Sequence, residues 1–189
     1  MTSIILASGS PRRQELLTQM GLPFTVLSPD VDEHTEIAEP EPMVRLLSQR
    51  KAEAVARLHP EAVVIAADTV VCLDHRTILG KPVDAADARR MLALLSGRSH
   101  EVYTGFTVRQ GDRSVTQSEC SRVRIRPLSP QEISRYVATG EPLDKAGSYA
   151  IQGLGSLFVS GINGDYYNVM GLPVCALGQV LAKFGITVL

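Results

Sequence analysis

Short apolar runs alternate along the chain with stretches in which apolar residues recur at helical spacing. The runs predict strands at residues 3–7, 24–27, 62–73, 101–110, 115–126 and 186–189. The helical spacing predicts helices at residues 11–20, 42–59, 85–96, 130–139 and 173–184. We therefore expect an α/β (mixed α+β) protein with one long twisted mixed sheet flanked by helices, in two lobes with a central cleft. No repeat or linker divides the chain, so we expect a single domain over residues 1–189.

The first predicted helix begins with two adjacent cations. Ser10 suits the N-cap and Pro11 the first helical position, and Arg12 and Arg13 follow directly. Cations are unfavourable at a helix N-terminus, which is itself a ready anion site. Two added guanidinium groups therefore indicate a multiply anionic ligand such as a phosphate chain. Two solvated surface arginines would give the same pattern.

Two further charged residues interrupt apolar surfaces. The second predicted helix places Val44, Leu47, Val55 and Leu58 on one face, and Lys51 fills a gap in that stripe. Lys51 could extend from the helix flank into water, or it could join Arg12, Arg13 and Lys81 in a cluster of cations.

Asp68 stands in the middle of the apolar strand "AVVIAADTVVCL". Burial of an ionised carboxylate is costly unless a cation or a metal compensates it, which favours a functional role over a turn cap at a strand end. The loop at residues 28–40 is rich in acids, and its "DEH" triplet, residues 32–34, offers carboxylates to a hard cation such as Mg²⁺. A solvated acidic loop is the alternative. Together these residues suit metal-assisted hydrolysis of a phosphoanhydride, and simple nucleotide binding almost as well.

Composition and missing motifs narrow the classes of function. The net charge of −1 argues against broad binding to nucleic acid or membrane. The three cysteines show neither disulfide nor zinc spacing, and the N-terminus reads as a strand and not as a signal peptide, which favours a reduced, cytoplasmic setting. Phosphate-binding loop, zinc-protease and serine-hydrolase motifs are absent. We expect the four histidines at the surface: His34, His59, His75 and His100.

Several motifs, in order along nearly the whole chain, resemble those of the Maf proteins, which are nucleoside triphosphate pyrophosphatases. These motifs are "LASGSPRRQELL", "VDE", "RKAEAV", "AADTVV", "GKP", "YTGF" and "DKAGSYAIQG". The resemblance implies a fold shared with the inosine triphosphate pyrophosphatases. It also implies hydrolysis between the α and β phosphates with a divalent cation, Mg²⁺ or Mn²⁺, and a homodimer.

The resemblance also implies roles for single residues. Asp68 corresponds to the proton acceptor, and Glu33 and Asp68 to acids that hold the metal or the water. The remaining positions correspond to binding of the triphosphate and choice of substrate: Ser8, Arg12, Arg13, Lys51, Thr69, Lys81 and Gln152. The resemblance further implies that Lys51 and Lys81 are catalytic residues together with Asp68.

Gln152 resembles the dTTP/UTP branch of the family, whereas the branch acting on 7-methyl-GTP typically has an acid there. A neutral amide can both donate to and accept from the edge of thymine or uracil, which fits this choice. We therefore expect hydrolysis of dTTP, UTP and modified pyrimidine nucleotides. The alternatives are a nucleotide-binding regulator of septum formation and cell division, and a pyrophosphatase of the 7-methyl-GTP branch.

Overall fold

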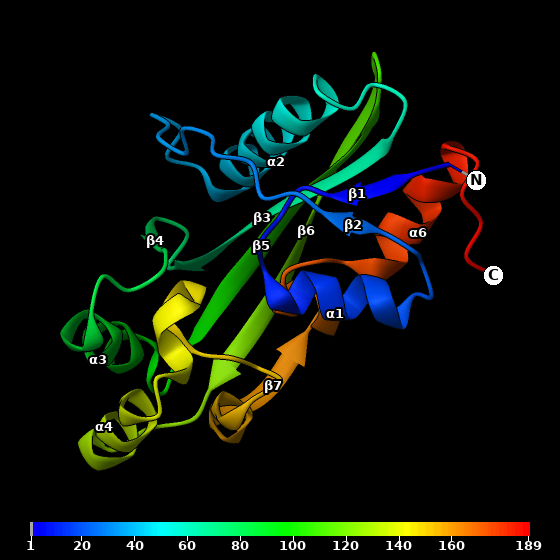
Figure 1. Ribbon diagram of the computed structural model, residues 1–189. Coiled ribbons are helices and arrows are strands. Elements are labelled where there is room, and N and C mark those ends of the chain that lie inside the picture. Colours follow the sequence, from blue (N-terminus) through cyan, green and yellow to red (C-terminus); the bar gives the residue numbers. More distant parts are fainter. Residues whose placement is uncertain (1) are drawn as a thin grey trace. The chain divides into compact units, whose positions relative to one another are not determined.

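A seven-stranded mixed sheet runs through the computed structural model, which describes residues 2–189 (Figure 1). The strand order is β2-β1-β3-β5-β6-β7, with β4 paired to β3. β1 is parallel to both β2 and β3, whereas β3–β4 and β6–β7 are antiparallel. The strands are β1 (Ile4–Leu6), β2 (Thr25–Val26), β3 (Val63–Leu73), β4 (Thr77–Leu79), β5 (Ser99–Gln110), β6 (Arg113–Ile125) and β7 (Val159–Asn163). The mixed sheet predicted from the sequence is confirmed.

Helices connect most of these strands. They are α1 (Pro11–Gln19), α2 (Pro40–Ala56), α3 (Ala85–Leu95), α4 (Pro130–Ala138), α5 (Tyr166–Met170) and α6 (Val174–Lys183). Three 3-10 helices follow α4: η1 (Glu141–Asp144), η2 (Ala146–Ser148) and η3 (Leu154–Phe158). Over residues 2–189, no helix combines the length and the apolar character that crossing a membrane requires.

The described chain forms two compact units. The first comprises residues 2–68, 104–119 and 171–189, and the second comprises residues 69–103 and 120–170. Strands β3, β5 and β6 each contribute residues to both units.

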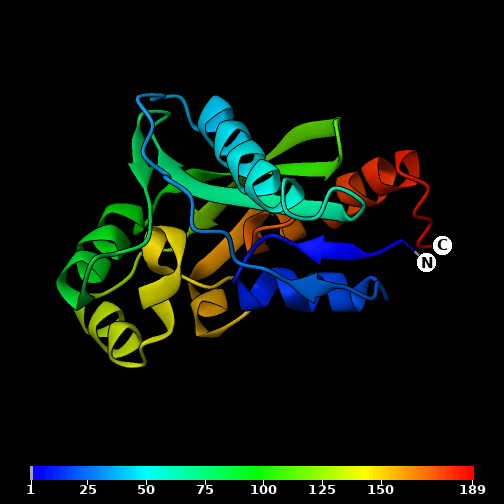
Figure 2. The same cartoon turned by 45° about the horizontal axis from the view of Figure 1, so that its top comes forward.

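In the first unit, α2 packs on β1 and β3. Apolar residues of these three elements, with Ala7 just after β1 and Ala62 just before β3, form one buried cluster: Ile5, Ala7, Ala52, Val55, Ala56, Ala62, Val64 and Ala66. α2 lies on one side of β1 and α1 on the other (Figure 2). A chain of hydroxyl groups joins α2 to the neighbouring strands β5 and β6, since Ser48 Oγ lies 2.9 Å from Thr107 Oγ1 of β5, which lies 2.9 Å from Thr116 Oγ1 of β6. These contacts fix α2, the helix that carries Lys51.

In the second unit, local capping determines where α4 begins. The Ser129 hydroxyl accepts from the Glu132 N–H, and the Glu132 carboxylate accepts from the Ser129 N–H, which forms a capping box. Arg126 Nη2 donates to the same carboxylate at 2.6 Å. These hydrogen bonds lower the pKa of Glu132 to about 2, Arg126 contributing most. The predicted start of this helix is confirmed.

Several local predictions are wrong. Residues 186–189 form no strand, although Ile186 and Val188 favour one, because a strand also needs a neighbour to pair with. Leu58 is 77% exposed because α2 ends at Ala56, two residues earlier. The short strands β4 and β7 were not predicted. For β7 the reason is that it lies in a glycine-rich segment with weak strand propensity.

His100 is buried, which corrects the surface position expected for it. It lies in β5 with only 2% of its surface exposed, and its Nε2 lies 2.8 Å from the Tyr149 hydroxyl. Across residues 2–189, the structure offers its buried Nδ1 no hydrogen-bond partner. Burial lowers the pKa of His100 to about 4. The imidazole is therefore neutral in the folded protein at physiological pH.

We expect this histidine to make the fold sensitive to mild acid. Between pH 6.5 and about 4 the unfolded chain binds a proton at His100 that the folded chain excludes, so stability is full above pH 6.5 and falls as the pH drops. The shift predicts a loss on the order of 2 kcal/mol between pH 7 and pH 5. Urea unfolding of the wild type and of His100→Asn at pH 7 and pH 5 measures this loss of unfolding free energy. An equal loss in both proteins would contradict the role of His100.

Candidate active site

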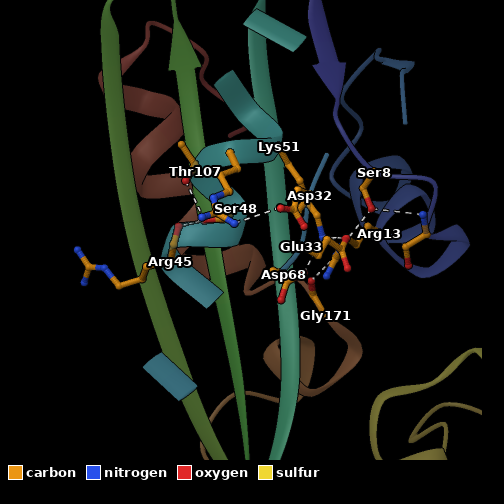
Figure 3. Close-up of polar contacts among 12 residues, drawn as sticks. Ser8, Arg13, Asp32, Glu33, Arg45, Ser48, Lys51, Asp68, Thr107 and Gly171 are labelled. Carbon is orange, nitrogen blue, oxygen red and sulfur yellow. Dashed lines mark hydrogen bonds and ion pairs between the residues drawn. The ribbon is translucent and has the colours of Figure 1, made fainter. Parts of the chain in front are cut away.

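The first unit holds a partly buried lysine between two carboxylates (Figure 3). Lys51 Nζ lies 2.6 Å from Asp68 Oδ1 and 2.8 Å from Glu33 Oε1. The side chains of Lys51 and Asp68 are only 12% and 13% exposed, whereas that of Glu33 is 62% exposed. The ammonium group thus compensates the carboxylate that interrupts β3. The sequence predicted that Asp68 needs such a partner, and the structure identifies it as Lys51.

Three different elements supply these side chains. Lys51 comes from the face of α2 that packs on β1 and β3, and Asp68 from the point of β3 where burial changes from full to partial. Glu33 comes from the loop before α2. Arg50 Nη1 donates to the main-chain oxygens of Asp32 and His34, at 3.1 and 2.8 Å, and so ties this loop to α2. The loop is therefore held where Glu33 reaches Lys51.

Arg13, at the start of α1, is held by two hydrogen bonds. Its Nε donates to the main-chain oxygen of Gly171 at 2.8 Å, and its Nη1 donates to Ser8 Oγ at 2.9 Å (Figure 3). Burial lowers the pKa of Arg13 to about 10, and the charges of Asp68 and Glu33 oppose this shift while that of Arg12 adds to it. Arg13 is therefore cationic at neutral pH and lies in the electrostatic field of both acids.

The chain turns from β1 into α1 through a short loop that carries Ser8. Ser8 is buried, and its hydroxyl also accepts from the Ser10 N–H at 3.3 Å. Ser10 occupies the N-cap position with extended backbone, as predicted, but its side chain makes no capping hydrogen bond in the described structure. The amide groups of this helix start are accordingly not satisfied by a Ser10 side chain, and an anion could accept from them.

The structure brings some predicted site residues together and places others in the second unit. Ser8, Arg13, Glu33, Lys51 and Asp68 form the contacts above, and the half-buried Arg12 is next to Arg13 in α1. In the second unit, Thr69 follows Asp68 in β3, the exposed Lys81 follows β4, and the exposed Gln152 lies in a turn between η2 and η3.

Glu33 and Asp68 can be tested as ligands of a divalent cation. Residues 2–189 contain no group of three or more His, Cys, Asp or Glu side chains able to hold a metal by themselves. Both carboxylates nevertheless contact one cationic atom, Lys51 Nζ, so they converge on a common position. Mg²⁺ is typically held by one or two carboxylates together with substrate phosphates. The donor set fits a metal that arrives with a phosphate ligand.

Sequence reasoning missed the carbonyl of Gly171, which fixes Arg13 from 158 positions away. No local signal in the sequence marks this oxygen, because any residue carries a main-chain carbonyl.

Comparisons with known proteins show what the chain is similar to. Residues 3–184 match the family model described as Maf-like protein. The dTTP/UTP pyrophosphatase of Symbiobacterium thermophilum is 51% identical over 186 residues, 98% of this chain and 95% of that protein. The dTTP/UTP pyrophosphatase of Bacillus cytotoxicus is 50% identical over 185 residues, 97% of this chain and 96% of that protein. Among solved structures, the Ham1 protein of Staphylococcus aureus has a similar fold, with a TM-score of 0.50 and 16% identity over 66% of this chain and 72% of that one.

Proposed function

The chain belongs to the Maf family, and from this premise we propose that it hydrolyses dTTP and UTP to the nucleoside monophosphate and pyrophosphate. The observation that carries the proposal is the partly buried Lys51–Asp68 pair in the unit whose helix start presents Arg12 and Arg13. Hydrolysis of a phosphoanhydride needs a carboxylate that can accept a proton and cations that can bind phosphate, and these residues supply both.

Asp68 serves as the proton acceptor in this proposal. A water molecule attacks the α-phosphorus and gives its proton to the Asp68 carboxylate, while the bond to the bridging oxygen breaks and pyrophosphate leaves. Lys51 holds Asp68 through the 2.6 Å contact between its Nζ and Asp68 Oδ1. The pair thereby keeps the base oriented and able to accept a proton.

Cations and polar donors bind the triphosphate in this proposal. Arg13, held by Ser8 and Gly171, contributes a fixed positive charge next to Arg12. Lys51 and Lys81 add positive charge, and the Ser8 hydroxyl adds a polar contact. Arginine suits phosphate oxygens because its planar group donates two parallel hydrogen bonds.

Glu33 and Asp68 would hold Mg²⁺ or Mn²⁺ together with phosphate oxygens. When bound, such an ion neutralises charge that develops on the phosphate oxygens. Their convergence on Lys51 Nζ supports this role.

Gln152 selects the base, together with Arg12 and Thr69. Gln152 is exposed in its turn, and its amide can both donate and accept, as recognition of thymine or uracil requires. We extend the proposal to modified pyrimidine nucleotides, which present a similar edge, and to one Maf domain over residues 1–189. The cytoplasmic location, the homodimer, and the expectation that neither a nucleic-acid polymer nor a membrane is a partner stay predictions.

The test is release of pyrophosphate from dTTP, UTP, CTP, GTP and 7-methyl-GTP with Mg²⁺ or Mn²⁺. We expect kcat/KM for dTTP and UTP to exceed that for the guanine nucleotides by at least about tenfold, the discrimination that one base-reading contact supports. Pyrophosphate as the product, without orthophosphate, would place cleavage between the α and β phosphates. Binding without turnover would favour the regulator, and preference for 7-methyl-GTP would overturn the role of Gln152.

A further inference from the structure

Gln152 lies in a tight turn whose backbone is held on both sides. The Gly153 N–H donates to the Ala150 carbonyl at 3.2 Å, which closes a turn with Ile151 and Gln152 at its centre. Ile151 is 6% exposed, whereas Gln152 is exposed. The turn therefore buries one central side chain and presents the other to solvent.

The Tyr136 hydroxyl holds the start of this turn. Tyr136 lies in α4 with 4% of its surface exposed, and its hydroxyl accepts from the Ala150 N–H at 3.0 Å. Its ring packs edge-to-face on Phe158, with centroids 4.9 Å apart. The same hydroxyl donates to Glu141 Oε1 at 2.8 Å. Tyr136 thus connects the first residue of the turn to a carboxylate.

Glu141 holds the end of the turn. Its Oε2 accepts from the Leu154 N–H at 3.0 Å, and its Oε1 accepts from the Gly155 N–H at 3.1 Å. Burial raises the pKa of Glu141, but hydrogen bonds from these two amides and from Tyr136 outweigh it and hold the pKa below its ordinary value. Glu141 is therefore an ionised acceptor at neutral pH, and charge-assisted hydrogen bonds of this kind are the stronger ones.

Two glycines permit this close approach. A Cβ added at Gly153 would lie 2.5 Å from Glu141 Oε2, and one added at Gly155 would lie 2.7 Å from the Ala150 carbonyl and 2.8 Å from the Tyr136 hydroxyl. The backbone of the turn therefore packs directly on Glu141 and Tyr136. Glu141 and the turn follow α4, in the segment drawn in yellow in Figure 1.

We propose that Tyr136 and Glu141 are positioning residues that fix the turn carrying Gln152 and thereby set the discrimination between uracil and cytosine. The inference rests on the proposed function, because it assumes that Gln152 reads the base. The side-chain amide of Gln152 can recognise a base edge only if the backbone of the turn is held in one place. In a mobile turn, each backbone conformation would present the donor and the acceptor of this amide in a different position. Neither positioning residue needs to touch the nucleotide.

The test compares Tyr136→Phe and Glu141→Gln with Gln152→Ala as the reference. Each protein is assayed for kcat and KM with UTP and CTP, and for Kd with the non-hydrolysable α,β-methylene analogues of both. We expect both positioning variants to lower the UTP/CTP ratio of kcat/KM, and the ratio of affinities, by about tenfold. The change should come through KM for UTP, with kcat within about threefold of the wild type.

A matched control is Tyr103→Phe in the same unit. The Tyr103 hydroxyl also donates to a carboxylate, Glu101 Oε2 at 2.9 Å, but its residue lies in β5 and not beside the turn. This variant should keep the wild-type discrimination. Combining Glu141→Gln with Gln152→Ala should add little to Gln152→Ala alone, because both act through one side chain.

The outcomes separate this inference from the proposed function. Discrimination lost in Gln152→Ala but retained in folded Tyr136→Phe and Glu141→Gln would overturn the inference and leave the function intact. An equal loss of kcat for UTP and CTP with an unchanged UTP/CTP ratio of kcat/KM would also overturn the inference, because it would show only a structural effect of the substitution. If the wild type binds the UTP analogue more tightly than the CTP analogue but releases no pyrophosphate, the proposed function is refuted. The ratio of Kd values for the two analogues in each variant would still decide the inference. Unchanged discrimination in Gln152→Ala would overturn the inference together with the role of Gln152, and no nucleotide binding by the wild type would overturn both the inference and the function.

Discussion

Replacing Asp68 with Asn is expected to lower kcat for dTTP and UTP by about 10²–10⁴-fold, the range typical of general acid–base catalysis. Asn fills the same volume and can still accept a hydrogen bond from Lys51, but it cannot take a proton from water. The contact between Lys51 Nζ and Asp68 Oδ1, at 2.6 Å, places this carboxylate beside the predicted phosphate site. The loss should therefore appear in kcat, while KM changes less.

Pyrophosphate release under saturating dTTP measures this effect. Asp112→Asn is the matched control, because it makes the same chemical change at an exposed position in the turn between β5 and β6. Thermal unfolding of each variant should show that the fold is retained. If Asp68→Asn keeps kcat within about threefold of the wild type, Asp68 is not the base.

Replacing Gly105 with Ala is expected to destabilise the first unit by about 3 kcal/mol or more, the upper range for forcing extra atoms into a packed core. Its Cβ would lie 2.5 Å from both the carbonyl carbon and the oxygen of Val44 and 2.7 Å from the Arg45 nitrogen. These are backbone atoms of α2, so no side chain can rotate away, and the helix itself must shift. Because α2 carries Lys51, activity should fall along with stability.

Urea unfolding monitored by circular dichroism gives the change in free energy. Gly178→Ala is the control, since Gly178 lies within α6 and an added Cβ would have no other atom within 4 Å. Alanine is the better helix former there, so this variant should gain about 0.5–1 kcal/mol. An unchanged midpoint for Gly105→Ala would mean that α2 does not pack on β5 as closely as described.

The fold could be predicted where the signal is local. The start of α1 follows from Pro11, that of α4 from the capping box of Ser129 and Glu132, and the long strand β3 from a long apolar run that only Asp68 and Thr69 interrupt. Residues 186–189 have the same local preference and form no strand, because pairing depends on a neighbour elsewhere in the chain.

The candidate site could be predicted as a set of residues but not as a set of contacts. An acid inside an apolar strand and a lysine on an apolar helix face are anomalies that the sequence displays, because burial of charge is costly wherever it occurs. The distance between Asp68 and Lys51 depends on how α2 packs on β3, which the small residues of the shared cluster determine. Arg13 likewise meets a carbonyl that no sequence pattern distinguishes.

The sequence by itself determined the class of fold, the family and the residue types available for chemistry, because propensity, capping and motif order are properties of neighbouring residues. Only the tertiary structure decided that one ammonium group joins Asp68 and Glu33, that His100 is buried, and that Tyr136 and Glu141 hold the turn of Gln152. Each of these depends on residues from different elements meeting in the folded chain, where packing fixes the position of one element against the others.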